Sequence, residues 1–199
     1  MKYKRLIAYI LDMLIIYIIS SFIFMIAFRN DYQKYTEATE DYFNNITNIA
    51  KETKDRNKMV DNVNEISYNY IKLGTTQTIF VITTEIIYFI FIQFFLNGQT
   101  LGKKLLKIKI VPLEGEKLEA GLFVLREIVL LVIPIRVIDL IALLTTGMNT
   151  YLKINNLTSN LNSIISILII GTILFRQDER GIHDLISKTK VIRVEKERK

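Results

Sequence analysis

The chain has 199 residues, of which 50% are hydrophobic and 23% are charged, and it contains no cysteine. It therefore forms no disulfide, no thiolate metal site and no cysteine nucleophile. Because His183 is its only histidine, a site with several histidine ligands within one chain is also excluded. We expect no enzymatic activity, no metal site and no cofactor.

Four long apolar segments predict four membrane-spanning helices, over residues 6–28, 77–97, 122–145 and 157–175. The first carries Asp12 as its only charge and is long enough, at about 1.5 Å per residue, to cross a hydrocarbon core of about 30 Å. A signal peptide has a shorter apolar region that ends at a small-residue cleavage site, and this segment has no such site. We expect a single all-α domain, a four-helix transmembrane bundle.

Lysine and arginine gather before the first span, in the loop 98–121 and in the tail 176–199. Cytoplasmic segments of membrane proteins carry such an excess of positive charge, so both termini are expected in the cytoplasm. An anionic inner leaflet attracts cations next to a span, and this attraction accounts for the net charge of +6. The expected partner is therefore the lipid bilayer and not a nucleic acid.

Two segments between the expected spans have patterns of their own. In the exterior loop 29–76, apolar residues recur at helical spacing, which predicts one or two helices. In the loop 98–121, residues 106–111 alternate with period two before the turn-like sequence 114–116, which predicts a small cytoplasmic β-hairpin. Gly98, just before it, is expected to cap the second span.

Charges inside the expected spans are candidates for function, because an ionisable group in lipid is costly. Asp12 and Glu85 are expected to bind a proton or a small cation in alternation, while Arg5 or Arg126 sets their pKa values. The expected partner of Asp12 is Arg126, or Arg5 of another subunit. In the alternative, Asp12 and the arginines form a structural cluster that holds the helices in register.

Other charged residues suggest local pairs. Arg136 and Asp139, three residues apart on one helix, are expected to neutralise each other. Asp184 can accept hydrogen bonds from Arg5, which would join the two ends of the chain. Next to it, His183 is expected to pack or cap a helix, with a pH sensor as the alternative.

Four separated motifs carry a resemblance to a known family. They are Arg5-Leu6-Ile7-Ala8-Tyr9-Ile10-Leu11-Asp12, Gly98-Gln99-Thr100-Leu101-Gly102-Lys103-Lys104-Leu105-Leu106, Leu125-Arg126-Glu127, and the segment from Arg180 to Ile192. In this order they resemble the RDD family of bacterial integral membrane proteins, named for one arginine and two aspartates, which here correspond to Arg5, Asp12 and Asp184. The resemblance implies a multi-pass protein of the bacterial cell membrane, with a transport role such as sodium/proton antiport.

Two functions of different classes remain open. The first is proton-coupled exchange of monovalent cations through Asp12 and Glu85. The second is a non-transporting accessory, assembly or immunity-type subunit that binds a partner through the exterior loop 29–76. Because four spans enclose little space, a homo-oligomer or another membrane partner is expected for transport.

Overall fold

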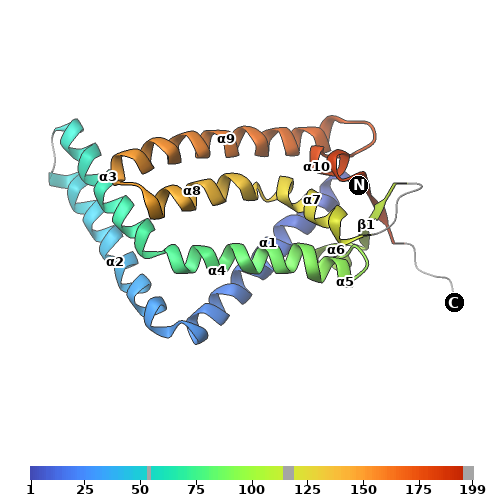
Figure 1. Cartoon of the computed structure of the whole chain (residues 1–199), viewed down its shortest axis with the longest axis horizontal. Helices are drawn as coiled ribbons and strands as arrows, with labels where there is room; N and C mark the ends of the chain where they lie inside the picture. The colour runs from blue at the N-terminus through green and yellow to red at the C-terminus, as the bar shows by residue number, and fades with distance from the viewer. Residues whose placement is uncertain (53–54, 114–118, 195–199) are drawn as a thin grey trace.

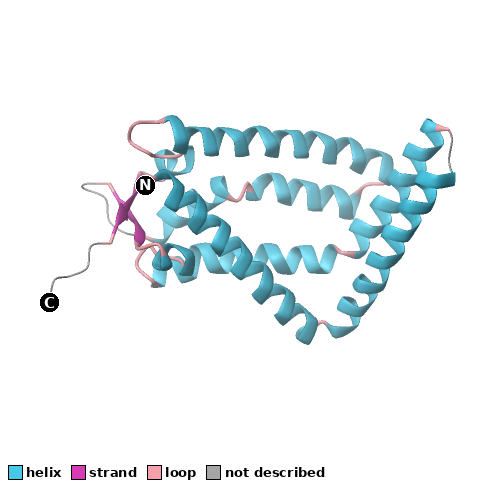
Figure 2. Cartoon of the chain, turned by 180° about the vertical axis from the view of Figure 1, so that it is seen from behind, coloured by secondary structure: helices cyan, strands magenta, loops and turns pink. Residues whose placement is uncertain are grey.

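The computed structural model describes residues 1–52, 55–113 and 119–194, and these residues are mostly helical. Helices α4, α8 and α9 run roughly parallel along the long axis of the molecule, while α1 crosses at an angle (Figure 1). Seen from behind, a helical pair closes one end and a small sheet lies at the other (Figure 2). The chain begins at the end that carries the sheet.

Three helical segments are long and apolar enough to cross a membrane. They are α1 (Lys2–Ala27), the continuous segment Thr75–Phe95, and α9 (Met148–Phe175). The middle segment comprises α4 (Thr75–Ile86), the π-helix η1 (Ile87–Ile92) and α5 (Gln93–Phe95). Many large apolar side chains on these segments are exposed, as expected for helix faces that contact lipid.

The third predicted span is not one straight helix. Helices α7 (Ala120–Leu130) and α8 (Ile133–Thr145) are apolar enough to cross a membrane together, but they are bent by 62°. Val132, between them, has a φ of 51°, and Pro134 lies in the first turn of α8. Proline is tolerated in a first turn but not in a helix interior, so a new helix begins here. Where the sequence predicted four spans, the described residues contain three candidate spans, or four if the bent pair α7–α8 is counted as a single span.

The expected helical insert is present as a pair of helices, α2 (Arg29–Glu52) and α3 (Arg56–Leu73). The side chain of Asp55 caps α3 by accepting hydrogen bonds from the first backbone N–H groups of that helix. The two helices pack through stacked tyrosine rings, with Tyr70 between Tyr35 and Tyr42. This hairpin lies at the end of the molecule opposite the sheet (Figure 1).

The predicted β-hairpin within the loop 98–121 is wrong in its pairing. Strand β1 (Ile108–Pro112) pairs antiparallel with β2 (Thr189–Arg193), which comes from the C-terminal tail. The alternation indicated a strand, but pairing depends on contacts between distant parts of the chain. The expected turn at residues 114–116 lies outside the described residues. Ile108, Ile110 and Val191 bury one face of the sheet against Phe123 and Ala8.

Two short helices connect the sheet to the spans, α6 (Leu101–Leu105) and α10 (Ile182–Ile186). As predicted, Gly98 ends the second span: it has a φ of 84°, and its N–H donates to the Gln93 carbonyl oxygen at 2.9 Å. An added Cβ there would collide with the backbone of Ile110, so the position requires glycine.

Candidate functional site

Five buried charged side chains meet near the end of the molecule that carries the sheet. They come from α1, α6, α7 and α10, and we call them the ion-pair cluster: Arg5, Lys103, Arg126, Glu127 and Asp184. Each of them is at most 8% exposed, so their charges depend on partners within the protein.

Arg5 and Asp184 form the contact that the sequence predicted. The Nη2 of Arg5 donates to Oδ2 of Asp184, and its Nη1 donates to the carbonyl oxygen of Glu179. The other Asp184 oxygen accepts from Nε of Arg126 at 3.1 Å, and the Gly181 N–H donates to Oδ2 at 3.0 Å. The first turn of α1 is thereby fixed to the segment that follows α9.

The surroundings of Asp184 favour its charged form. Burial acts to raise the pKa of this carboxyl, but the charges of Arg126, His183 and Arg5 outweigh burial and hold the pKa well below its usual range. Asp184 is therefore an anion at physiological pH, matched by two arginines.

His183 is 1% exposed, and burial, followed by the positive charge of Arg126, lowers its pKa to about 3. Asp184 acts in the opposite direction but with a smaller effect. The imidazole of the folded protein is therefore neutral between pH 5 and 8, which favours packing over the pH-sensor alternative. Its Nδ1 is buried and has no hydrogen-bond partner among the described residues.

Asp12 is fully buried, but its partners are not the expected arginines. Oδ1 accepts hydrogen bonds from the Tyr88 hydroxyl at 2.6 Å and the Gly102 N–H at 2.7 Å, and Oδ2 accepts from the Thr100 hydroxyl at 2.5 Å. The expected pairing with Arg126 is wrong because the face of α1 that carries Asp12 meets α6 instead, while a pairing with Arg5 of another subunit stays a prediction. Asp12 therefore joins α1 to the N-terminus of α6.

Three further polar residues of this region were not singled out from the sequence: Gln93, Lys103 and Glu127. Arg126 donates to Glu127, the Gln93 amide donates to Glu127 at 3.1 Å, and Lys103 donates to the Gln93 amide oxygen. The sequence did offer a signal for Gln93, since a glutamine within an otherwise apolar segment indicates a polar contact inside the protein. The other two lie within motifs already noted, next to the residues that drew attention.

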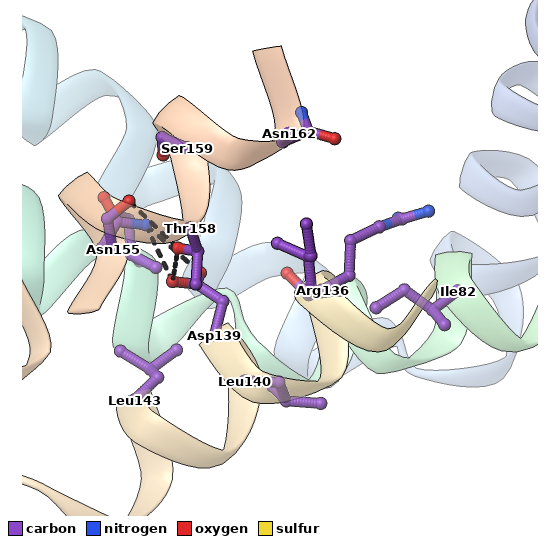
Figure 3. A pocket seen from close by; sticks show the side chains of 12 residues that line it. Ile82, Arg136, Asp139, Leu140, Leu143, Asn155, Thr158, Ser159 and Asn162 are labelled. Atoms are coloured by element: carbon purple, nitrogen blue, oxygen red, sulfur yellow. Dashed lines mark hydrogen bonds between the residues drawn. The ribbon is translucent and has the colours of Figure 1, made fainter. Parts of the chain in front are cut away.

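A second polar site lies nearer the α2–α3 hairpin, between α4, α8 and α9. Arg136 donates to Glu85, and the carboxylate of Asp139 accepts from the Asn155 amide at 3.0 Å and the Thr158 hydroxyl at 3.0 Å. The expected Arg136–Asp139 pair is therefore wrong, since the two side chains point to different helices (Figure 3). Proximity along one helix did not decide the pairing, because α4 and α9 offered each of them another partner.

Arg136 and Asp139 line a cavity of about 200 Å³. Polar side chains from α4 and α9 complete much of its wall: Thr78, Asn155, Thr158, Ser159 and Asn162. Figure 3 shows Asp139 facing Asn155 and Thr158, while Arg136 extends toward the side of Ile82. In the described part of the chain Asp139 has no cationic side chain within ion-pair distance, and its side-chain partners are the neutral donors of Asn155 and Thr158.

The structure does not bring Asp12 and Glu85 into contact. Asp12 belongs with Tyr88 and α6, whereas Glu85, one turn before Tyr88, pairs with Arg136. Across residues 1–52, 55–113 and 119–194, no group of three or more histidine, aspartate or glutamate residues is arranged to hold a metal ion.

Comparison with known proteins gives one family match. The family model described as RDD family matches residues 3–188, nearly the whole chain. No curated protein and no solved structure matches the chain.

Proposed function

The chain belongs to the RDD family, and from this premise we propose that it is a multi-pass protein of the bacterial cytoplasmic membrane that exchanges a small monovalent cation for protons. Family membership and the three candidate spans support a multi-pass membrane protein. The proposal gives the protein no enzymatic role.

In the proposed orientation the bent pair α7–α8 is a fourth span and both termini lie in the cytoplasm. Two of the basic segments, the chain start and the region around α6, lie at the same end of the molecule (Figure 1). Lys4, Lys104 and Lys107 are exposed there, where an anionic leaflet would attract them. The α2–α3 hairpin then lies outside the cell.

The observation that carries the transport proposal is the polar cavity at Asp139. Ionisable residues within membrane-spanning helices are costly, face the bundle interior or a water-filled cavity, and mark ion pathways and proton relays. The Asp139 carboxylate offers hard oxygen ligands and can take up a proton, and hydroxyl and amide groups surround it. One carboxylate with neutral neighbours suits a proton or a monovalent cation better than a divalent ion.

Glu85 and Arg136 would tune this site. When a cation occupies the cavity, it repels Arg136 and strengthens the Arg136–Glu85 pair, which favours a position of the guanidinium away from Asp139. The proposal that Asp12 itself binds the transported ion stays a prediction. Its three donors favour a positioning role between α1 and α6.

The test is cation-dependent proton flux in liposomes that contain the purified protein, with sodium, potassium or lithium as the cation. We expect flux from the wild type, loss of flux in Asp139→Asn, and reduced flux in Glu85→Gln. Asp31→Asn, in the first turn of α2, is the matched control and should leave flux unchanged. Asp12→Asn is measured in parallel.

Each outcome has a defined meaning. Flux that persists in Asp139→Asn but is lost in Asp12→Asn, with both variants folded, would assign the ion to Asp12. Absence of flux from the folded wild type with all three cations would overturn the transport proposal.

A specific observation favours the second candidate, an accessory or immunity-type subunit. Phe43 is 63% exposed and Val60 is 49% exposed on the α2–α3 hairpin, and α2 buries none of its residues. Exposed aromatic and aliphatic side chains at the far end of a membrane protein are available to a partner, including a second copy of the chain. Flux that survives deletion of residues 31–72 would argue against this candidate.

A further inference from the structure

A second cavity, of about 380 Å³, lies between α1 and α9, next to the ion-pair cluster. Its volume is in the range of small-molecule pockets, about 300–1,000 Å³. Apolar side chains of α1 and α9 form its walls: Leu6, Ile10, Ile169, Ile170 and Ile173. In the described chain α9 packs closely on α8 and α10 rather than on α1. The side chains of α1 and α9 therefore leave space between the two helices, and this space is the cavity.

The polar end of this pocket is cationic. Arg5, Lys103, Arg126 and His183 line it, whereas the carboxylates of Glu127 and Asp184 are not among its lining groups. Each arginine donates to a carboxylate, but Lys103 donates only to the neutral amide oxygen of Gln93 and forms no ion pair with a described residue.

Lys103 is thus a buried cation without a direct counter-charge. It is 7% exposed, and burial, followed by repulsion from Arg126, lowers its pKa to about 8, although the more distant charges of Glu127, Asp12 and Asp184 act in the opposite direction. A buried charge is costly unless an opposite charge balances it. The unpartnered Nδ1 of His183, which lines the same pocket, adds a second unsatisfied polar group.

The apolar walls of the pocket belong to two helices that are apolar enough to span a membrane. On its solvent side, contacts between the start of α1 and the segment after α9 close the gap: the Met1 amino group lies 3.3 Å from Glu179, and Lys2 Nζ donates to the Leu174 carbonyl oxygen at 2.6 Å. On the opposite side Ile10 is 57% exposed and Ile170 is 45% exposed, on helices apolar enough to span a membrane. A molecule that reaches Lys103 by this route must itself reside in the bilayer.

We propose that this pocket holds one anionic phospholipid, with its phosphate at Lys103 and the beginning of an acyl chain between α1 and α9. A phosphate oxygen would accept a charge-assisted hydrogen bond from the ammonium group, and the isoleucine walls would contact methylene groups. The lipid would also fix α1 against α9, which contact each other less closely than α9 contacts α8 and α10. This inference goes beyond the proposed transport, since lipid binding requires no ion movement.

The experiment is native mass spectrometry of the delipidated full chain, titrated with phosphatidylglycerol or with phosphatidylcholine of the same acyl chains. We expect one phosphatidylglycerol to be retained per chain in preference to phosphatidylcholine. Lys103→Gln should weaken its binding roughly 10- to 100-fold, the loss expected for one hydrogen bond to a charged group. Lys104→Gln, an exposed lysine of the same short helix, is the matched control and should bind as the wild type does.

A second pair of variants tests the apolar part without removing a charge. Ile170→Trp narrows the mouth of the pocket and should prevent retention, whereas Ile167→Trp, 70% exposed on α9 and not a lining residue, should not. This pair keeps the test valid if Lys103→Gln does not fold. The proposal would be overturned if both lipids were retained equally, or if each variant and its control lost lipid binding equally. Displacement of the lipid by inorganic phosphate would also overturn it.

Discussion

Arg5 donates to the carboxylate of Asp184, although the two residues are 179 positions apart in the sequence. The contact joins the first turn of α1 to α10, and Arg126 of α7 shares the same carboxylate. If one of these three elements moved away from the buried anion, it would leave a buried charge unpaired, which is costly. Arg5 and Asp184, from the two ends of the chain, therefore act as one structural unit.

This arrangement predicts unequal costs for the two halves of the pair. Asp184→Asn should destabilise the protein more than Arg5→Gln does, because Asp184 also accepts from Arg126 and from the Gly181 N–H. Breaking a buried pair typically costs about 3–5 kcal/mol, and the double variant should cost less than the sum of the two. Denaturant unfolding in mixed micelles measures the loss in free energy of unfolding for the two single variants and for the double variant. Additive costs would show that the two residues do not interact.

A second prediction concerns Gly102, whose N–H donates to Asp12. A Cβ at this position would lie 2.9 Å from the Asp12 carboxylate and still closer to the Ala8 carbonyl oxygen, so α1 and α6 would have to separate. We expect Gly102→Ala to cost about 1–3 kcal/mol of stability. Gly121→Ala is the matched control, because a Cβ there meets no atom within 4 Å, and its unfolding midpoint should not fall. A similar loss in both variants would exclude the close approach of α6 to Asp12.

The apolar segments and the helical insert could be predicted from the sequence because both depend on local composition and periodicity. The break at Val132 was partly signalled by Pro134, but the sequence does not show where the helix before a proline ends. The strand at residues 108–112 was also signalled, whereas its partner at the C-terminus was not. Alternation identifies a strand, but it does not say which other strand it pairs with.

The contacts of the charged residues could be predicted only in part. Arg5 lies in the first turn of α1 and Asp184 lies in the short helix that follows α9. Both positions are next to an end of a predicted span, so position along the spans was enough to bring them together. Asp12, Glu85 and Asp139 lie within apolar helices, where the partner depends on how each helix is rotated about its axis. A helix that is apolar nearly all round does not encode that rotation, so neutral partners such as Tyr88 were missed.

The third prediction tests the pairing of β1 with β2 by a disulfide. Lys109 and Ile192 are Cα partners in the sheet, and the register makes them a hydrogen-bonded pair, with Cα atoms about 5.5 Å apart, within the range of a disulfide. Since the chain has no cysteine, the variant Lys109→Cys with Ile192→Cys should form a single intramolecular bond under mild oxidation.

The control places the second cysteine two residues earlier along β2, as Lys109→Cys with Lys190→Cys. Lys190 pairs with Val111, so its Cα lies diagonally from Lys109, about 7–8 Å away and too far for an unstrained bond. Thiol labelling followed by mass spectrometry of the cleaved chain measures both yields. A hairpin within residues 98–121 would leave the Ile192 position unpaired and the two yields equally low.

The last prediction follows from the buried His183. Its pKa in the folded protein is about 3, below the ordinary 6.5 that applies in the unfolded chain. Between these values the unfolded state binds more protons, so the free energy of unfolding decreases as pH falls below 6.5, by up to about 1.4 kcal/mol per pH unit. About one pH unit above 6.5 and higher, where the histidine is neutral in both states, the residue adds almost no pH dependence.

We therefore expect the wild type to lose stability between pH 6.5 and 5.5 in micelle unfolding experiments, and His183→Gln to show a flatter profile. No other histidine contributes, because His183 is the chain's only one. The pKa of Asp184 lies well below its usual range, so the loss of stability that follows protonation of Asp184 occurs at lower pH. Ser187→Ala is the control: the Ser187 hydroxyl donates to the His183 carbonyl oxygen at 2.8 Å, so its removal should lower stability equally at every pH. Parallel profiles for the wild type and His183→Gln would mean that the imidazole accepts a proton without unfolding, and that α10 opens to water in this pH range.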